Sequence, residues 1–192
     1  MIKKKENYVR MRKHSEHPEN QDDFPGFENY PIWIVFISNL VLIAIYLIGA
    51  LIVYKVGWTW LLIAYLIFVG YLEFKLIKGH CVNCYYYGKT CAFSKGRISS
   101  MFFKKGDREK FCRTQITWKD ILPDFLVSLI PIAIGVILLI KDFNSVLLSE
   151  IIILILLTFV GNALIRGQLA CKHCKQKDIG CPAEKLFQGK RK

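Results

Sequence analysis

The residues of this chain best suited to do chemistry are its seven cysteines. Six of them form two sets with the same spacing, C-x2-C-x6-C. The first cysteine set is Cys81, Cys84 and Cys91, and the second cysteine set, displaced by 90 residues at each position, is Cys171, Cys174 and Cys181. A C-x2-C turn lets two thiolates converge on one ion, and a following loop returns a third. The repeated spacing therefore predicts metal binding in both segments.

The number of available ligands differs between the two sets. The first set reaches four thiolates if it recruits Cys112, the remaining cysteine, whereas no cysteine follows the second set. A different solution pools the C-x2-C pairs of both sets into one four-thiolate site across a pseudo-twofold axis, with the other three cysteines nearby. His80 and His173 are adjacent to ligand candidates, and neighbouring side chains of such a turn point apart. We therefore interpret both histidines as polar side chains and not as ligands.

The nature of the metal follows from the ligand type. Zinc and iron–sulfur clusters both accept four thiolates, so the cysteines predict a zinc site or, as the alternative, an iron–sulfur cluster. Cys181-Pro182 matches the Cys-Pro ending of ferredoxin cysteine runs, but the spacing before it does not. Redox-active thiols and buried free cysteines are the remaining interpretations. Structural disulfides are disfavoured because all seven cysteines are expected on the reducing side of a membrane.

Four long apolar runs are the elements that must position these cysteines. They cover residues 31–54, 56–72, 121–140 and 146–165. The hydrocarbon layer of a bilayer needs ~20 apolar helical residues, or roughly 17 at the short end, so each run is long enough to span it. With 53% hydrophobic residues in 192, the composition excludes a disordered chain, a secreted disulfide scaffold and a purely cytosolic enzyme. The sequence predicts an all-α integral membrane protein with four transmembrane helices.

The basic residues indicate the orientation of these helices. Of the 27 Lys and Arg residues, 25 fall in the two terminal segments and the middle segment, and only Lys55 and Lys141 fall in the turns between spans. Positively charged loops stay in the cytoplasm. We therefore expect a multi-pass protein of the cell membrane, with both termini and all cysteines in the cytoplasm.

The chain divides into five segments. A basic N-terminal segment, 1–30, precedes two tandem hairpins at 31–77 and 120–166. The first hairpin is followed by a cysteine segment with a basic interfacial stretch, 78–119, and the second by a cysteine segment with a basic tail, 167–192. Each hairpin returns the chain to its starting side, so the two repeats are parallel. We expect a four-helix bundle with both cysteine segments on its cytoplasmic face.

Aromatic and basic residues near the spans predict contact with the membrane surface. Rings at span ends favour the headgroup layer, and here they are Tyr30, Trp33, Tyr54, Trp58, Trp60 and Trp118. The run Tyr85-Tyr86-Tyr87 fits an electron carrier, but tyrosines are also good headgroup anchors, so the run discriminates little between the functions considered.

The stretch between Cys91 and the third span is both basic and amphipathic. Apolar Met101 and Phe102 stand beside Lys104 and Lys105 in a chain of net charge +12. We interpret it as an interfacial helix and turn facing anionic lipid headgroups. A cytoplasmic protein is a further possible partner. Nucleic acid is not an expected partner, because every basic cluster abuts a span and has a topological cause.

The sequence contains no phosphate loop, Ser-His-Asp set or His-Glu metal helix. We therefore predict a non-enzymatic membrane protein whose cytoplasmic cysteine-rich module binds a metal and serves partner or lipid interaction. One alternative is a membrane-associated iron–sulfur electron carrier. A second alternative is soft-metal transport, disfavoured because no span contains Cys or His, or thiol redox chemistry.

Overall fold

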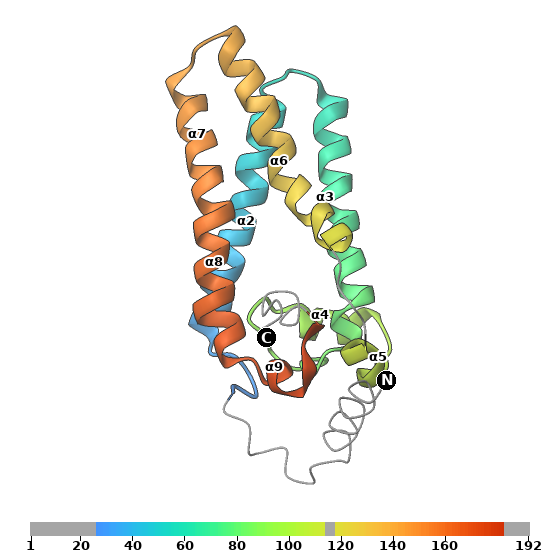
Figure 1. Ribbon diagram of the computed structural model, residues 1–192. Coiled ribbons are helices and arrows are strands. Elements are labelled where there is room, and N and C mark those ends of the chain that lie inside the picture. The colour runs from blue at the N-terminus through green and yellow to red at the C-terminus, as the bar shows by residue number, and fades with distance from the viewer. Residues whose placement is uncertain (1–25, 114–117, 183–192) are drawn as a thin grey trace, which may run out of the picture.

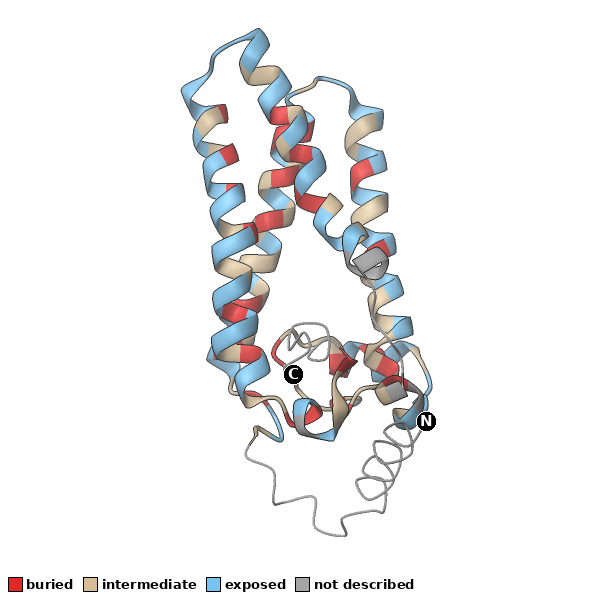
Figure 2. Cartoon of the chain, in the orientation of Figure 1, coloured by how far each residue is buried: buried red, intermediate tan, exposed pale blue. Residues whose placement is uncertain are grey.

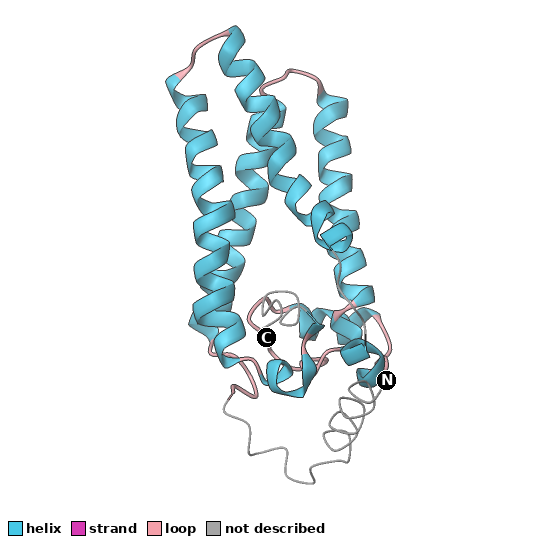
Figure 3. Ribbon diagram, viewed as in Figure 1, coloured by secondary structure: helices cyan, strands magenta, loops and turns pink. Residues whose placement is uncertain are grey.

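The computed structural model describes residues 26–113 and 118–182, and within them the chain is all-helical with no β-strand (Figures 1 and 3). Four of the helices are long and apolar enough to cross a membrane. The prediction of an all-α, four-span membrane protein is confirmed at this level. Most of the N-terminal segment 1–30 and of the basic tail lies outside the described residues.

The four spans start close to the predicted apolar runs, and two of them end later. Helix α2 covers Ile32–Tyr54, α3 covers Thr59–Gly79, α6 covers Trp118–Lys141, and the fourth span starts as α7, Ser145–Leu156. The fourth span continues through π-helical turns, Leu157–Gly161 and Ile165–Ala170, on either side of the short α8, Asn162–Leu164. The second and fourth spans therefore run past residues 72 and 165, directly into the two C-x2-C turns.

Local sequence determines where the spans begin. Pro31 stands immediately before α2, where its missing N–H leaves no donor unpaired. Asn144 caps α7, because its side-chain oxygen accepts hydrogen bonds from the N–H groups of Val146 at 2.9 Å and Leu147 at 3.4 Å. These signals separate the helices at short turns and let the apolar runs pair as hairpins.

Helix α2 is the central span and packs against α3, α6 and α7. Its residues Ile34, Ile52 and Val53 are fully buried, and Figure 2 shows buried residues on the inward faces of the helices. Gly49 permits the close approach of α3, because a Cβ at this position would lie 2.3 Å from the hydroxyl oxygen of Tyr65. The outward faces are apolar and exposed, as lipid requires.

The two ends of the bundle are built differently. The loop end consists of the short connections 55–58 and 142–144, and an ion pair between Lys55 Nζ and Glu150 Oε2 at 2.7 Å joins the first connection to α7. The opposite end carries a layer of short helices and loops (Figure 1). Its helices are α4, Lys95–Phe102, α5, Arg108–Arg113, and α9, Lys175–Gly180. This layer, residues 26–30, 80–113 and 171–182, is here termed the cysteine module because it contains all seven cysteines.

Candidate functional site

Each C-x2-C pair lies in a short 3-10 turn that continues a span into the cysteine module. The turns are Cys81–Asn83 and Cys171–His173. The N–H of the second cysteine donates to the carbonyl of the first, at 3.3 Å in the first set and 3.4 Å in the second. Three residues further on, Tyr87 and Lys177 donate to the carbonyls of the second cysteines at 3.1 and 3.0 Å. Equal spacing in the sequence therefore gives matching backbone turns.

The third cysteine of the first set is held by the start of α4. The N–H of Gly96 donates to Sγ of Cys91 at 3.3 Å. Ser94, with a left-handed φ of 58°, turns the chain into α4. Only glycine fits at position 96, because a Cβ there would lie 2.1 Å from the carbonyl oxygen of Tyr86. The hydrogen bond fixes the sulfur of Cys91 beside the first turn of α4.

Residues Gly26–Tyr30, here termed the N-terminal strap, lie between the two cysteine sets. The N–H of Phe27 donates to the carbonyl of His173 at 3.0 Å, and the N–H of Tyr30 donates to the carbonyl of Thr90 at 2.9 Å. Phe27 also forms an isolated parallel bridge with Cys174. The strap therefore connects the loop of the first set to the turn of the second.

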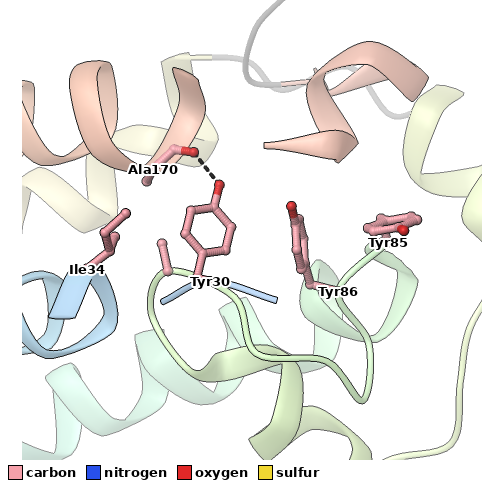
Figure 4. Close-up of a cluster of buried hydrophobic side chains, with 6 residues drawn as sticks. Tyr30, Ile34, Tyr85, Tyr86 and Ala170 are labelled. Carbon is pink, nitrogen blue, oxygen red and sulfur yellow. Dashed lines mark hydrogen bonds between the residues drawn. The ribbon is translucent and has the colours of Figure 1, made fainter. Parts of the chain in front are cut away.

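Three tyrosines form the core of the module (Figure 4). Tyr30, Tyr85 and Tyr86 are only 4%, 4% and 2% exposed. The Tyr30 hydroxyl donates to the carbonyl of Ala170, and the Tyr86 hydroxyl donates to the carbonyl of Phe27 at 2.6 Å. Their rings and hydroxyls find partners inside the module, and the placement of Tyr30 in the headgroup layer stays a prediction.

Hydrogen bonds join the segments that follow Cys84 and Cys174. The N–H of Tyr85 donates to Oε1 of Gln176 at 2.7 Å, and the N–H of Lys175 donates to the hydroxyl of Tyr86 at 3.1 Å. Gln176 is 2% exposed. The buried position of Gln176 could not be predicted from the sequence, because a single Gln in a polar segment carries no signal of burial.

The thiols of Cys84 and Cys174 interact electrostatically across this contact. Burial raises the pKa of Cys84 to about 12, and the neighbouring Cys174 adds to the shift. Burial likewise raises the pKa of Cys174 to about 11, although hydrogen bonds from the backbone of Gln176 and Lys177 oppose it. Both thiols are therefore protonated at neutral pH, and a metal must displace their protons to bind.

The carboxylate of Glu28 gathers polar groups from both sets at the solvent edge of the strap. It accepts a hydrogen bond from the Tyr85 hydroxyl at 2.9 Å and lies 3.2 Å from Nζ of Lys175 and 3.7 Å from Nζ of Lys89. The Tyr85 hydrogen bond, followed by the one from Lys175, lowers the pKa of Glu28. The strap is thus attached by a charged group as well as by its backbone.

Cys112 lies beside residues between Cys174 and Cys181, whereas one of the two arrangements predicted from the sequence placed it with the first set. Its Sγ lies 3.8 Å from the carbonyl oxygen of Ile179 and 3.8 Å from Nε2 of Gln176. A Cβ added at Gly180 would lie 3.5 Å from the same sulfur. Helix α5 therefore carries this thiol across to α9, a contact between segments far apart in the sequence.

The remaining thiols divide between the two halves of the module. Cys81 interacts electrostatically with Cys91, and Cys174 does so with Cys181 and Cys171. None of the seven cysteines, all of which lie in the described residues, forms a disulfide. Among the residues that the structure describes, no three His, Cys, Asp or Glu side chains are close enough together to hold a metal ion.

The two histidines next to the C-x2-C pairs pack against aromatic rings. The His80 and Phe111 ring centroids are 6.0 Å apart, and those of His173 and Phe27 are 5.0 Å apart. His80 also borders a small pocket between α3 and α6, which is lined by Leu72, Lys75, Leu76, His80, Pro123 and Asp124. The first histidine thus links α3 to α5, and the second links the strap to the second set.

A polar network that the sequence analysis did not identify lies beneath the module. The hydroxyl of Tyr46 donates to Oε1 of Glu73 at 2.5 Å, and Nζ of Lys95 lies 2.7 Å from Oε2 of Glu73. Lys95 is the first residue of α4, so the pair joins the module to α3. Helix α3 continues beyond Glu73 because this charge is paired, whereas the predicted span ended before it.

The chain matches no protein-family model, no curated protein and no solved structure.

Proposed function

We propose that this chain is a multi-pass membrane protein whose cytoplasmic cysteine module binds a thiolate-preferring metal, with zinc as the resident ion. One observation carries the proposal: Cys84 and Cys174, which belong to sets 90 residues apart, pack against the same buried cluster, and hydrogen bonds join the segments that follow them. The tandem C-x2-C-x6-C repeat supplies further thiols on both sides of this contact. The proposed role is binding and assembly and not catalysis.

The surroundings of the thiols support a structural zinc site. Gly96 donates a hydrogen bond to the sulfur of Cys91, and backbone groups of Tyr86 do so for Cys84. Such contacts around a metal ligand orient it and offset its negative charge. Zinc prefers a closed, tetrahedral set of thiolates and contributes directly to folding. In the proposed bound state the thiols lose their protons and converge on the ion.

The proposed orientation places the cysteine module in the cytoplasm. The warrant is the partition of basic residues, of which 25 of 27 belong to the same side as the cysteines. The loop end, with Lys55 and Lys141, then faces outwards. Impermeant maleimide on sealed cells tests this orientation, because labelling of Cys84 or Cys174 from outside would reverse it.

Anionic lipid is the proposed partner of helix α4. Met101 and Phe102 are 78% and 73% exposed, and residues 104–105 are exposed lysines. The ring of Phe103 packs against that of Phe74 on α3 at 5.6 Å, which keeps this end of α4 beside a membrane-spanning helix. Apolar side chains at such a position enter the headgroup layer while the lysines attract anionic lipid.

An iron–sulfur electron carrier is the second candidate, favoured by the aromatic contacts near Cys84. The ring centroids of Tyr30 and Tyr86 are 5.4 Å apart, and those of Tyr86 and Tyr85 are 5.2 Å apart. These buried rings connect the N-terminus of α2 to the thiols at the proposed membrane surface. Such an environment suits a cluster that exchanges electrons with a membrane-bound carrier.

Anaerobic purification of the full-length protein in detergent, followed by metal analysis and visible spectroscopy, separates the two candidates. We expect stoichiometric zinc without visible absorption, lost in Cys84→Ala/Cys174→Ala and retained in Ser100→Ala, an exposed control in α4. A brown protein whose colour is bleached by dithionite would contradict the zinc proposal and support the iron–sulfur cluster. Protein without metal in which all seven thiols titrate would overturn both.

A further inference from the structure

The second cysteine set has three thiols of its own, and a fourth lies beside it. The sulfur of Cys112 contacts the backbone carbonyl of Ile179 and the side chain of Gln176, each at 3.8 Å. Gly180 directly precedes Cys181, and a Cβ added at Gly180 would lie 3.5 Å from the sulfur of Cys112. The position of Cys112 is therefore bounded by residues that follow Cys174 and residues that precede Cys181.

Gln176 fixes this arrangement from inside the module. Its side chain is almost fully buried, with Oε1 accepting from the N–H of Tyr85 at 2.7 Å and Nε2 directed at the sulfur of Cys112. Because the backbone N–H of Tyr85 holds the oxygen of the Gln176 amide, the N–H group of that amide points at the sulfur of Cys112 and acts as a weak donor. Donors of this kind support a negatively charged metal ligand. The thiol is thus positioned by a buried polar group that belongs to the second set.

The first set retains a separate third thiol. Cys91 accepts the hydrogen bond from Gly96, and it interacts electrostatically with Cys81. Both residues belong to the segment between α3 and α4, so their proximity needs no contribution from α5. The two halves of the module therefore differ in composition, with three thiols in one and four in the other.

We infer that Cys112 is the fourth ligand of the second cysteine set, so that the segment between the two hairpins completes a site in the C-terminal segment. The four ligands are Cys112, Cys171, Cys174 and Cys181. This inference rests on the proposed metal-binding function. Binding of Zn²⁺ releases the S–H protons of these thiols to solvent and leaves a closed site of net charge −2. The first set then has three thiolates and one position open to exchange.

A double-mutant cycle on the full-length protein tests the assignment. Zinc affinity is measured by competition with a chromophoric chelator for Cys112→Ser, Cys181→Ser, Cys91→Ser and the two double variants that contain Cys112→Ser. Loss of one ligand should weaken the tight site by at least about 100-fold, the upper end of what loss of a supporting contact costs. The Cys112/Cys181 double variant should be weakened far less than the product of its single effects, whereas Cys112→Ser and Cys91→Ser should act independently.

Alkylation of the wild-type protein provides a readout that needs no substitution. Mass spectrometry follows maleimide labelling of each cysteine as zinc is titrated into chelator-treated protein. Cys112 should become protected at the same zinc concentration as Cys171, Cys174 and Cys181. Protection of Cys112 together with Cys81 and Cys91, or no protection of it at all, would overturn the inference.

The outcomes separate this inference from the proposed function. A wild-type protein that binds no metal would remove both. A wild-type protein that binds zinc while Cys112 couples to Cys91, or to neither partner, would remove only the assignment of Cys112. Circular dichroism and size-exclusion profiles of the variants identify any that fail to fold, and the alkylation result then decides.

Discussion

The loop end and the cysteine end close the same pairs of helices, yet they do so with different kinds of contact. At the loop end, Lys55 joins the turn after α2 to Glu150 on α7, and Trp58 and Trp60 stack in the open with ring centroids 5.7 Å apart. At the cysteine end, the strap, three buried tyrosines and Gln176 connect segments from every part of the chain. Reversing the chain needs only a turn, whereas placing particular thiols side by side needs a packed core.

The largest expected effect is a steric one at the cysteine end. Gly96→Ala places a methyl group 2.1 Å from the carbonyl oxygen of Tyr86 and 2.6 Å from that of Lys89, and both contacts are to backbone. We expect the module to lose about 3 kcal/mol of stability, because overpacking of this kind forces the backbone to move. Hydrogen exchange of the amides between residues 84 and 96 measures the loss.

Gly70→Ala is the matched control within a span, since no heavy atom lies within 4 Å of the added methyl group. Replacing a helical glycine by alanine in open space should change stability by at most about 1 kcal/mol. Equal protection of the amides in Gly96→Ala and the wild type would show that the close packing around α4 is not needed for the module.

The second expected effect is on the pH dependence of zinc binding, which distinguishes the two ends because only one holds thiols. The pKa of Cys84 is raised to about 12 and that of Cys174 to about 11, so both carry protons at neutral pH. Each displaced proton makes the affinity of its site for zinc roughly tenfold higher per unit of pH. Calorimetry in buffers of different ionisation enthalpy counts the protons released. An affinity that does not change between pH 6 and 8 would contradict the buried, protonated state.

The same pKa shifts predict the alkaline stability of protein stripped of metal. A thiol with a pKa raised above its ordinary value of 9.0 favours the folded state while it is neutral. This contribution is complete below pH 9 and is lost as the pH rises through about 11 and 12. Melting of the module in that interval, with the spans still helical by circular dichroism, is the expected result.

The third prediction compares the ion pairs of the two ends. Glu73→Gln leaves Lys95, only 12% exposed, without its carboxylate and weakens the contact with Tyr46. We expect a loss of about 1–3 kcal/mol, the usual cost of leaving a buried polar group without its partner. Thermal unfolding in detergent measures it. A melting temperature equal to that of the wild type would mean that α4 is held to α3 by apolar contacts alone.

The smallest effect belongs to the loop end. Glu150→Gln removes the carboxylate that faces Lys55, whose side chain is 33% exposed. Exposed pairs contribute about 0–1 kcal/mol, so the melting temperature should move less than in Glu73→Gln. A larger loss than in Glu73→Gln would reverse the comparison and place the decisive polar contact at the turns.

The spans could be predicted from the sequence because a membrane imposes a length and a polarity that can be read locally. The predicted ends were less accurate. The second predicted span ended before Glu73, whereas α3 continues to Gly79 because Lys95 neutralises that charge from a different helix. Trp58 and Trp60 are exposed at the start of α3, and their place in the headgroup layer stays a prediction.

The composition of the candidate site was predictable, but its arrangement was not. Spacing alone identified the two cysteine sets and their turns, because a C-x2-C pair is a local feature. The contacts of Cys112, the buried position of Gln176 and the burial of Tyr30 depend on segments far apart in the chain. Tyr30 has the pattern of a membrane anchor, and its place in the core depends on Ala170 beside its hydroxyl and Tyr86 beside its ring, both distant in the sequence.

The N-terminal strap has a consequence for the order in which the protein is assembled during its synthesis. Tyr30 hydrogen-bonds to a carbonyl 140 residues later, and Phe27 does so to His173, beyond the last span. A ribosome adds ~5–20 residues per second, so the strap waits roughly 7–30 s for these partners to be made. Throughout that interval the loop of the first cysteine set lacks both the strap contact to the second set and Gln176. The module therefore closes only after the fourth helix has been inserted, so a closed module implies that all four helices are in the membrane.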